Sequence, residues 1–441
     1  MRIAHVLRRL SFDDWGGTEQ VVWNIAKAQK AAGHEVRLFA TTALWKGLVA
    51  TKNAKNTKGI KKALCSMCPL CSLWLKNESY AETIDGIEIV RFEPIYPWWP
   101  MPKSLVDELD RKGGNPFVPG LGRALREWKP DVIHCHAMAR IAELCLRTAH
   151  SPTPSLPHLP TPKCVVSLHG GAANVPGAEA KSLKAPTRGR FPWGKLIDIA
   201  MGWTRRVPED FDGIVCVGED EYLKYREKHP HVMFLPNGVD CTMFATTPRL
   251  NYPTTQPPNR LTILCVARID RQKNQMALVE AVARHPGMAL RLVGPVTQTD
   301  YNEELKRRAA ELGVVDRVAF VGALKPGSPE LLAEYARADA FALASRHEPF
   351  GIVVLEAWAA GLPVLASDVG GLGRLCAAHP DAALTFSADD ASGLDRAIAE
   401  LAGRIASGDV RKMSDAGRSA AAEYDWRVLS ARLTDFYGQA S

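Results

Sequence analysis

Short apolar runs alternate with amphipathic segments along this chain, and this alternation constrains the fold more than any other feature. Runs rich in Val, Ile and Leu predict buried strands, and segments with helical periodicity lie between several of them. Strands that alternate with helices form parallel sheets through right-handed crossover connections. The first set of expected strands comprises Ile3–Leu7, Glu35–Ala40, Ile87–Phe92, Val132–Cys135, Val165–Leu168 and Ile214–Val217. The helices expected between them include Glu19–Ala32, Leu121–Trp128 and Ala137–His150.

A second series of strands and helices follows and repeats this architecture. Its expected strands are Leu261–Val266, Leu290–Val293, Val318–Val321, Ala340–Ala344, Pro363–Ala366 and Leu384–Phe386. Its expected helices are Asn274–Ala283, Glu303–Leu312, Glu330–Ala338 and Ile352–Ala360. The fold class is therefore α/β, with two doubly wound, Rossmann-like domains that face a central cleft. Ligands are expected at the loops that follow the strands and face that cleft.

The domain boundaries follow from length and composition. A chain of 441 residues is long enough for two or three domains. We predict an N-terminal domain over residues 1–245 and a Pro-, Thr- and Asn-rich linker over 246–259. A C-terminal domain over 260–424 and a helix over 425–441 that ties the two domains together complete the prediction.

The balance of charge is mildly basic. Lys and Arg number 55 and Asp and Glu 48, which gives a net charge of +7. This excess suits an anionic ligand or an acidic membrane surface, and we expect no nucleic-acid partner because no recognition module appears. No apolar stretch is long enough to cross a bilayer, and no signal-peptide core follows Met1. We expect a cytoplasmic protein that associates, if at all, with the cytoplasmic face of a membrane.

The most informative segment is S-R-H-E-P-F-G-I-V-V-L-E-A-W-A-A-G-L-P, which runs from Ser345 to Pro363. It predicts a strand end, a tight turn and the start of a helix, where backbone amides without partners and the helix dipole favour a phosphate. The amides concerned belong to Phe350, Gly351 and Ile352. Glu348 before the turn and Glu356 inside the helix place two carboxylates where they can accept hydrogen bonds from sugar hydroxyls. A solvated Glu and a capping Glu would explain the same pattern in isolation.

Two loops near the domain starts carry further candidates. V-A-R-I-D-R-Q-K places Arg268 and Lys273 just after the first strand of the second domain, where both can reach a diphosphate. Solvated loop cations are the plain alternative. In the first domain, Gly16 and Gly17 precede a helix that begins near Thr18, which is either a second anion site or a plain turn.

Five motifs in order resemble those of retaining glycosyltransferase family 4 (group 1), whose members have the GT-B fold. They are G-G-T-E at Gly16–Glu19, S-L-H-G at Ser167–Gly170, P-N-G-V-D at Pro236–Asp240, A-R-I-D-R-Q-K at Ala267–Lys273 and E-P-F-G-I-V-V-L-E-A-W-A-A-G-L-P-V from Glu348. The resemblance spans most of the chain, and the spacing of Glu348 and Glu356 is its most specific element.

The resemblance implies roles for the second-domain residues. Arg268 and Lys273 would bind the diphosphate of a nucleotide sugar and stabilise the leaving group. Glu348 would contact the donor sugar, Glu356 the ribose hydroxyls, and the amides of 350–352 the diphosphate. Such enzymes need no metal or other cofactor, since protein cations do that work. The reaction implied is transfer of a hexose with retention of its anomeric configuration, through an oxocarbenium-like state.

The first domain is expected to contribute the acceptor side. By the same resemblance, the loop at Gly16 and Gly17 closes near the donor phosphate and acceptor, and His169 acts at the reacting sugar. His136 and Asn237 are expected to line the cleft. His136 and His134 lie two residues apart on an expected strand and point to the same face, yet no ligand set accompanies them, so no metal is predicted.

An insertion of about residues 45–80 departs from the regular pattern. Its basic part, Lys46–Lys62, has six Lys and no acid, and it predicts peripheral contact with an anionic membrane, although a solvated loop has the same composition. Cys65, Cys68 and Cys71 lack a fourth ligand, and their role is left open.

The resulting hypothesis is a hexosyltransferase that uses a UDP- or GDP-sugar. Its acceptor would be a glycan, a lipid-linked molecule or a small molecule, in cell-surface polysaccharide or glycolipid synthesis. A sugar-nucleotide epimerase, a glycan phosphorylase or a non-catalytic sugar-nucleotide- or glycan-binding protein of the same fold are the alternatives. The motifs do not select the nucleotide base, the sugar, the acceptor, the linkage or the oligomeric state.

Overall fold

A computed structural model describes most of the chain and divides it into two compact units. The described residues are 1–12, 17–43, 79–96, 104, 109, 116–138, 140–150, 161–169, 208–245 and 260–439. The first unit comprises Met1–Pro236 and Leu429–Ser441, and the second Asn237–Val428. The chain thus passes into the second unit at Asn237, ahead of the predicted linker, which lies outside the described residues together with the basic and Cys-containing insertion at 44–78.

The first unit contains an eight-stranded sheet in the order β3-β4-β2-β1-β5-β6-β7-β8. The strands are β1 (Arg2–Arg9), β2 (Glu35–Thr41), β3 (Ser79–Ile84), β4 (Ile87–Phe92), β5 (Val132–Cys135), β6 (Lys163–Leu168), β7 (Gly213–Cys216) and β8 (Val232–Phe234). All neighbouring pairs are parallel except β3 and β4. That hairpin turns at Asp85 and Gly86, which both have positive φ, as a two-residue turn requires. Our sequence prediction omitted β3.

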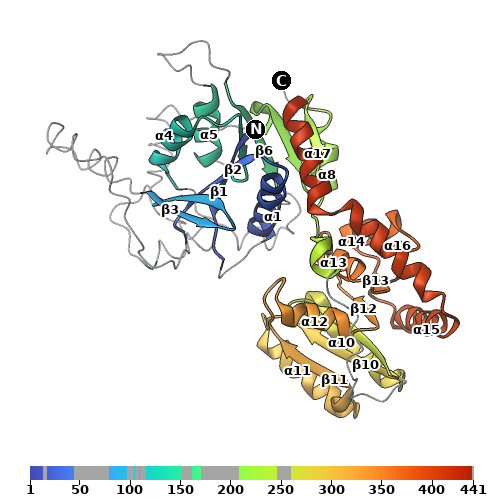
Figure 1. The fold of residues 1–441 in the computed structure, drawn as a ribbon. Helices are drawn as coiled ribbons and strands as arrows, with labels where there is room; N and C mark the ends of the chain where they lie inside the picture. The colour runs from blue at the N-terminus through green and yellow to red at the C-terminus, as the bar shows by residue number, and fades with distance from the viewer. Residues whose placement is uncertain are drawn as a thin grey trace, which may run out of the picture. The chain divides into compact units, whose positions relative to one another are not determined.

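Helices connect the strands of the first unit. Among the described residues these helices are α1 (Gly17–Ala31), α4 (Pro119–Trp128), α5 (Arg140–His150) and α8 (Glu219–Tyr225), with a 3-10 turn at Pro208–Asp210, and the C-terminal α17 (Trp426–Gln439) follows at the end of the chain (Figure 1). On β1, Ala4 and Val6 belong to one apolar cluster and Leu7 to another. Side chains of neighbouring strand residues point to opposite faces, so β1, which is buried from Ile3 to Leu7, is covered on both faces.

The second unit contains a parallel six-stranded sheet in the order β11-β10-β9-β12-β13-β14. Its strands are β9 (Leu261–Val266), β10 (Met288–Val293), β11 (Val318–Gly322), β12 (Ala340–Leu343), β13 (Val364–Ser367) and β14 (Ala383–Phe386). In sequence order this is 3-2-1-4-5-6, the doubly wound arrangement of dinucleotide-binding domains. The strand order reverses between β9 and β12, and the predicted Rossmann-like architecture of this unit is confirmed.

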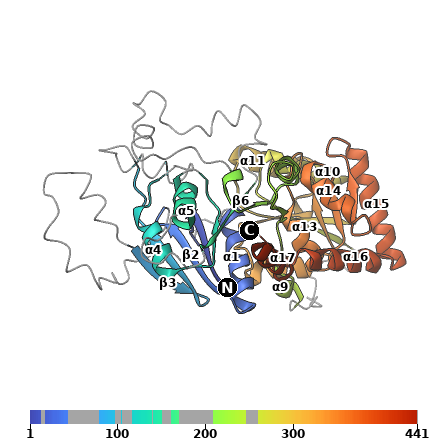
Figure 2. The same cartoon turned by 90° about the horizontal axis from the view of Figure 1, so that it is seen from above.

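The helices of the second unit cover both faces of its sheet. They are α9 (Cys241–Ala245), α10 (Gln275–Arg284), α11 (Thr299–Glu311), α12 (Pro329–Arg337), α13 (Ile352–Ala359), α14 (Gly370–Ala378), α15 (Ala391–Ser407) and α16 (Val410–Glu423), with 3-10 turns at Arg271–Lys273 and Val315–Arg317. Figure 2 shows α15 and α16 side by side at one end of this unit. Leu278 of α10 lies in one apolar cluster and Leu355 of α13 in another, so these two helices pack on opposite faces.

The largest fully buried side chain of the second unit, Trp358 on α13, has a polar group that needs a partner. Its indole Nε1 donates a hydrogen bond of 2.9 Å to the carbonyl oxygen of Ala382, which satisfies its only donor. Gly417 on α16 faces the same ring, and a Cβ there would lie 2.8 Å from Trp358. These contacts fix α13, the helix that follows the predicted ligand loop, against the rest of the unit.

The C-terminal helix begins in the second unit and continues in the first. Leu429, Leu433, Phe436 and Tyr437 of α17 are buried, and from Leu429 onward the helix belongs to the first unit. The first three recur every three to four residues, and Tyr437 lies four residues after Leu433, so all four share one side of the helix. Among the described residues, no helix is both long and apolar enough to span a membrane.

We predict that Leu433→Ala lowers the free energy of unfolding by about 2–5 kcal/mol, because it removes a fully buried side chain and leaves a cavity. Urea unfolding followed by intrinsic fluorescence measures this. Arg432→Ala, on the exposed face of the same helix, is the matched control. Equal stability of the two variants would contradict the packing of α17 described above.

Candidate active site

The predicted ligand-binding residues of the second unit gather where the strand order of its sheet reverses. Arg268 and Lys273 follow β9, and Glu348 follows β12, its neighbour in the sheet. The backbone amide of Arg346 donates a hydrogen bond of 2.8 Å to the carbonyl oxygen of Gln272, and this bond joins the two loops. In open α/β sheets ligands bind at this reversal, beyond the carboxyl ends of the strands.

Lys273 and Glu348 form an ion pair across the two loops. Lys273 Nζ lies 2.6 Å from Glu348 Oε2, and the side chains are only 13% and 12% exposed. The 3-10 turn that carries Lys273 is capped by Asp270, whose side chain accepts a hydrogen bond from the Gln272 amide. A cation and a carboxylate are therefore held together, largely shielded from water, at the reversal point.

Arg268 lies on the same loop and is less constrained. Its side chain is 52% exposed, and its guanidinium lies 3.6 Å from Asp270. The side-chain amide of the buried Gln275 donates a hydrogen bond of 2.7 Å to the Arg268 carbonyl oxygen, which fixes the backbone while the side chain extends outward. Arg268 can thus turn its planar fork of donors toward an anion.

Gly294, at the end of β10, supports the Arg268 loop and was missed by the sequence prediction. A Cβ on Gly294 would lie 2.0 Å from the Ala267 carbonyl oxygen, and its φ of +148° is rarely adopted by other residues. The loop therefore lies directly against a residue without a side chain. A glycine at the end of a predicted strand was the only signal available in the sequence.

The start of α13 carries three backbone amides that point to anion binding. Gly351 caps this helix with φ +89°, a left-handed conformation that favours glycine. Within the described part of the chain, the amides of Phe350, Gly351 and Ile352 donate no hydrogen bond. Unpaired amides and the positive end of the helix dipole together favour a phosphate.

Gly370 and Gly371, at the start of α14, lie directly against the loop that carries Glu348. The amide of Gly371, in the first turn of α14, donates a hydrogen bond of 3.0 Å to the Glu348 carbonyl oxygen. A Cβ on Gly371 would lie 1.8 Å from the Pro349 carbonyl oxygen, and one on Gly370 would lie 2.8 Å from that of Glu348. The sequence prediction did not assign this role to either glycine.

Glu356, the second predicted carboxylate, lies inside α13 and has a different partner. The hydroxyl of Tyr335 donates a hydrogen bond of 2.6 Å to Glu356 Oε2. Burial raises the pKa of Glu356, and the hydrogen bond from Tyr335 opposes this shift. Tyr335 was not predicted as a site residue, because it lies on the apolar face of an expected helix and resembles a core residue.

In the first unit the strand order reverses between β1 and β5, and four histidines gather there. His5 on β1 is paired in register with His134 on β5. His136 follows β5, and its amide donates to the Val6 carbonyl oxygen, while His169 follows β6. The rings of His134 and His136 are 4.1 Å apart, and His136 Nδ1 lies 3.0 Å from His169 Nε2. The structure thus brings the two predicted histidines, His136 and His169, into contact.

Each ring nitrogen of the three buried histidines has a hydrogen-bond partner within 3 Å. His5 contacts His136 and Gln29, and His136 contacts His5 and His169. His134 contacts the hydroxyls of Tyr437 and Ser167. Their ligand atoms lie close enough together for a metal ion, but an ion would have to displace these hydrogen bonds.

Burial keeps this cluster neutral. It lowers the pKa of His5 and of His169 to about 4. The pKa of His136 is well below its usual value, first because of burial and then because of the neighbouring imidazoles. Neutral imidazoles each have one N–H donor and one bare nitrogen acceptor, so they suit hydrogen bonding to hydroxyl groups.

The remaining predicted residues, at the start of α1 and at Asn237, have few contacts that bear on ligand binding. Gly17 begins α1, but Gly16 lies outside the described residues. Glu19, in the first turn of α1, is buried and pairs with Arg9 at 2.6 Å. Asn237, the first residue of the second unit, is partly buried.

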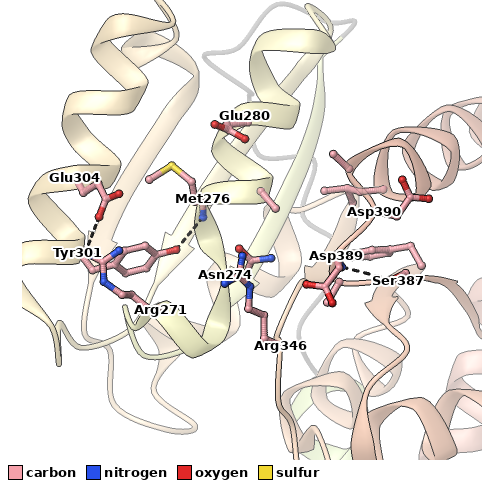
Figure 3. A pocket seen from close by; sticks show the side chains of 15 residues that line it. Arg271, Asn274, Met276, Glu280, Tyr301, Glu304, Arg346, Ser387, Asp389 and Asp390 are labelled. Carbon is pink, nitrogen blue, oxygen red and sulfur yellow. Dashed lines mark hydrogen bonds and ion pairs between the residues drawn. The ribbon is translucent and has the colours of Figure 1, made fainter.

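A cavity of about 390 Å³ shares residues with both ligand loops (Figure 3). Asn274 and Arg346, which line it, flank the loops that carry Lys273 and Glu348, and α10, α11 and α15 supply other lining residues. Inside it, the Met276 amide donates a hydrogen bond of 3.0 Å to the hydroxyl of Tyr301. None of the predicted site residues lines this cavity.

Taken together, these features define a class of protein. Two doubly wound domains, one with a cation–carboxylate pair beside unpaired amides, are typical of GT-B proteins that handle nucleotide sugars. The family of glycosyl transferases group 1 matches residues 251–410, and the glycosyl transferase 4-like domain matches residues 16–238. The chain belongs to this glycosyltransferase family.

Individual relatives agree with this assignment. A GDP-mannose-dependent alpha-(1-6)-phosphatidylinositol monomannoside mannosyltransferase of Mycobacterium tuberculosis is 31% identical over 280 residues, which cover 59% of this chain and 70% of that protein. A glycogen synthase of the same species is 27% identical over 322 residues, which cover 71% of this chain and 69% of that protein.

Solved structures share the fold. A glycosyltransferase of Rickettsia africae has a TM-score of 0.64 at 15% identity and covers 100% of this chain and 98% of its own. HepE of Anabaena, in complex with UDP and glucose, has a TM-score of 0.61 at 15% identity, with 100% of each chain covered. The predicted GT-B fold is confirmed.

We predict that Gly294→Ala destabilises the second unit by about 1–3 kcal/mol and reduces turnover, since the new Cβ displaces the Arg268 loop and φ +148° is strained. Gly313→Ala is the matched control, because Gly313 also has a positive φ but open space around it. Thermal unfolding and initial rates measure the difference. If Gly294→Ala were no worse than Gly313→Ala in either, the close contact would have no importance.

We predict that the stability of the first unit falls as the pH drops from about 6.5 to about 4. The folded-state pKa of His5 is about 4, so the unfolded chain binds more protons in this window, and the stability is fully present only above it. The loss should be at least about 1.4 kcal/mol, the value of one pKa unit. Urea unfolding at several pH values measures it.

His5→Gln should flatten this pH dependence, and His347→Gln, at an exposed position of the second unit, should not. A slope that His5→Gln leaves unchanged would contradict the neutral, buried cluster.

Proposed function

We propose that this chain transfers a hexose from a UDP- or GDP-sugar to a glycan, a lipid-linked molecule or a small-molecule acceptor, with retention of configuration. The observation that carries the proposal is the shielded Lys273–Glu348 pair, which lies in the loops where the second sheet reverses its strand order. The names of the relatives and of the solved structures mention GDP-mannose and UDP with glucose, which supports these donor classes.

The cations of the β9 loop would bind the donor diphosphate. As the bond to the sugar breaks, the leaving diphosphate gains negative charge, and cations already in position stabilise that charge without reorganising. Arg268 is exposed enough to bind a diphosphate with two parallel hydrogen bonds, and Lys273 supplies a point charge. The amides of 350–352 would add donors, so protein groups replace a metal ion in this role.

The carboxylates would hold the sugar parts of the donor. Glu348 would accept hydrogen bonds from hydroxyls of the transferred sugar, since its second oxygen is not needed for the bond to Lys273. Glu356, oriented by Tyr335, would bind the ribose hydroxyls. His169, with the loop at Gly16 and Gly17, would act at the reacting sugar, and His136 and Asn237 would line the site.

The setting we propose is the cytoplasmic side of a membrane, where acceptors for cell-surface polysaccharide or glycolipid synthesis are found. Lys46–Lys62 would provide the membrane contact through their positive charge. No nucleic-acid partner is part of the proposal.

We predict that Lys273→Met lowers kcat/KM for the nucleotide sugar by about 10²–10³, because a positioned stabiliser of the leaving group is lost. The test measures release of nucleoside diphosphate from UDP-, GDP- and ADP-sugars and the thermal shift with each free diphosphate. Lys306→Met, which removes an exposed lysine of the same unit, is the matched control.

Two results would contradict the proposal. If no diphosphate stabilises the wild-type protein, the donor site does not bind nucleotides as described. If a diphosphate binds but no sugar nucleotide is turned over with any acceptor class, the protein is a binding protein of the same fold and not a transferase.

A further inference from the structure

A chain of hydrogen bonds leads from the interior of the first unit to His169. Gln29 on α1 has its Oε1 2.7 Å from His5 Nε2, and His5 Nδ1 lies 2.9 Å from His136 Nε2. His136 Nδ1 in turn lies 3.0 Å from His169 Nε2. Gln29 and His5 are fully buried, His136 is nearly so, and His169 is partly buried.

Three neutral imidazoles linked in this way cannot choose their tautomers independently. Each ring has one N–H and one bare nitrogen, and each of the two ring-to-ring hydrogen bonds needs a donor on one side and an acceptor on the other. If one ring reverses its tautomer, its neighbours must reverse too, or two lone pairs or two N–H groups face each other in a buried place. The chain therefore has two states, one for each direction.

Gln29 decides between the two states. In this structure the Gln29 amide turns its Oε1 toward His5 Nε2, and because an amide oxygen can only accept, His5 carries its proton on Nε2 and accepts at Nδ1. His136 then donates from Nε2 to His5 and accepts at Nδ1, and His169 donates from Nε2 to His136. His169 Nδ1 is thus left unprotonated, and it has no hydrogen-bond partner among the residues that the structure describes.

The fourth histidine does not set this direction. His134 has a hydroxyl on each side, Tyr437 at Nδ1 and Ser167 at Nε2. Hydroxyl groups donate or accept equally well, so either tautomer of His134 satisfies them. Because the Tyr437 hydroxyl also interacts with the Gln29 side chain, the control in this branch is Ser167.

We propose that Gln29, His5 and His136 are positioning residues that hold His169 in the Nε2–H tautomer, so that its bare Nδ1 accepts a hydrogen bond from a hydroxyl of the bound sugar. The proposal rests on the function proposed above, in which His169 acts at the donor sugar. In the opposite tautomer His169 would present an N–H group, and the sugar hydroxyl would have to reverse its own hydrogen bond.

The first experiment reads the tautomers directly. Long-range proton–nitrogen spectra of the full chain with ¹⁵N-labelled histidine distinguish protonated from bare ring nitrogens, and single His→Gln variants assign the signals. In the wild-type protein we expect Nε2–H on His5, His136 and His169 together. Nδ1–H on His169 would overturn the proposal, and this result needs no variant that perturbs Gln29.

Gln29→Leu removes the acceptor that selects the direction. We expect the Nδ1–H tautomer to appear on all three rings in this variant, and Ser167→Ala, which changes only the partner of His134, to leave them unchanged. A folded Gln29→Leu protein with wild-type tautomers would overturn the proposal. If the variant does not fold, the wild-type spectrum alone decides.

The kinetic consequence separates positioning from general damage. Gln29→Leu should lower kcat/KM for the nucleotide sugar about tenfold, the effect of one weakened hydrogen bond. The thermal shift with the free nucleoside diphosphate should stay the same, since that ligand lacks the transferred sugar that would contact His169. Reversed tautomers with unchanged kinetics would overturn the proposal, whereas absence of turnover in the wild type contradicts the proposed function and leaves the tautomers measurable.

Discussion

At the centre of the second sheet, β9 and β12 lie side by side, but the crossover connections that leave them run to opposite sides. The chain from β9 returns through α10 to β10, and the chain from β12 returns through α13 to β13, on opposite faces of the sheet. The loops that follow β9 and β12 therefore diverge from each other at the carboxyl ends of these two central strands. The backbone groups of these loops are not needed for strand pairing. The Lys273–Glu348 pair and the amides at the start of α13 lie between these loops. Gly294 lies against the backbone of the Arg268 loop, and Gly371 lies against the backbone of the Glu348 loop.

The first sheet repeats this geometry with different chemistry. Its order reverses between β1 and β5, and the side chains at that point are buried neutral imidazoles rather than the partly buried charges of the second unit. Burial accounts for this difference in charge, because it disfavours the charged form of a histidine. A partly buried ion pair could exchange one partner for a phosphate, whereas the buried neutral histidines would pass on only the direction of their hydrogen bonds, as proposed above.

Much of this could be predicted from the sequence because the signals are local. The apolar runs Val132–Cys135 and Leu261–Val266 coincide with β5 and β9, and the turn at Gly351 opens a helix as expected. The supporting residues could not be predicted. Gly371 lies against the carbonyl of Pro349, 22 residues earlier in the sequence, and Tyr335 bonds to Glu356 from another helix. Periodic patterns in the sequence do not predict such contacts. Strand β3 was missed because its sequence, S-Y-A-E-T-I at the edge of the sheet, contains no apolar run, although the Asp-Gly turn after it is a hairpin signal.

The position of Lys273 also shows how the pair with Glu348 would serve the leaving-group role proposed for it. A lysine in open solvent is strongly hydrated, and a ligand would have to remove that water at the moment of reaction. Beside Glu348 the Lys273 side chain is only 13% exposed before any ligand arrives, so much of its desolvation is complete when the protein has folded. When an anion enters, the ammonium can shift part of its interaction from the carboxylate to the phosphate, and the freed carboxylate oxygens can accept from sugar hydroxyls. The ion pair thus prepares both partners at once, which a lone cation or a lone carboxylate at the same place would not do.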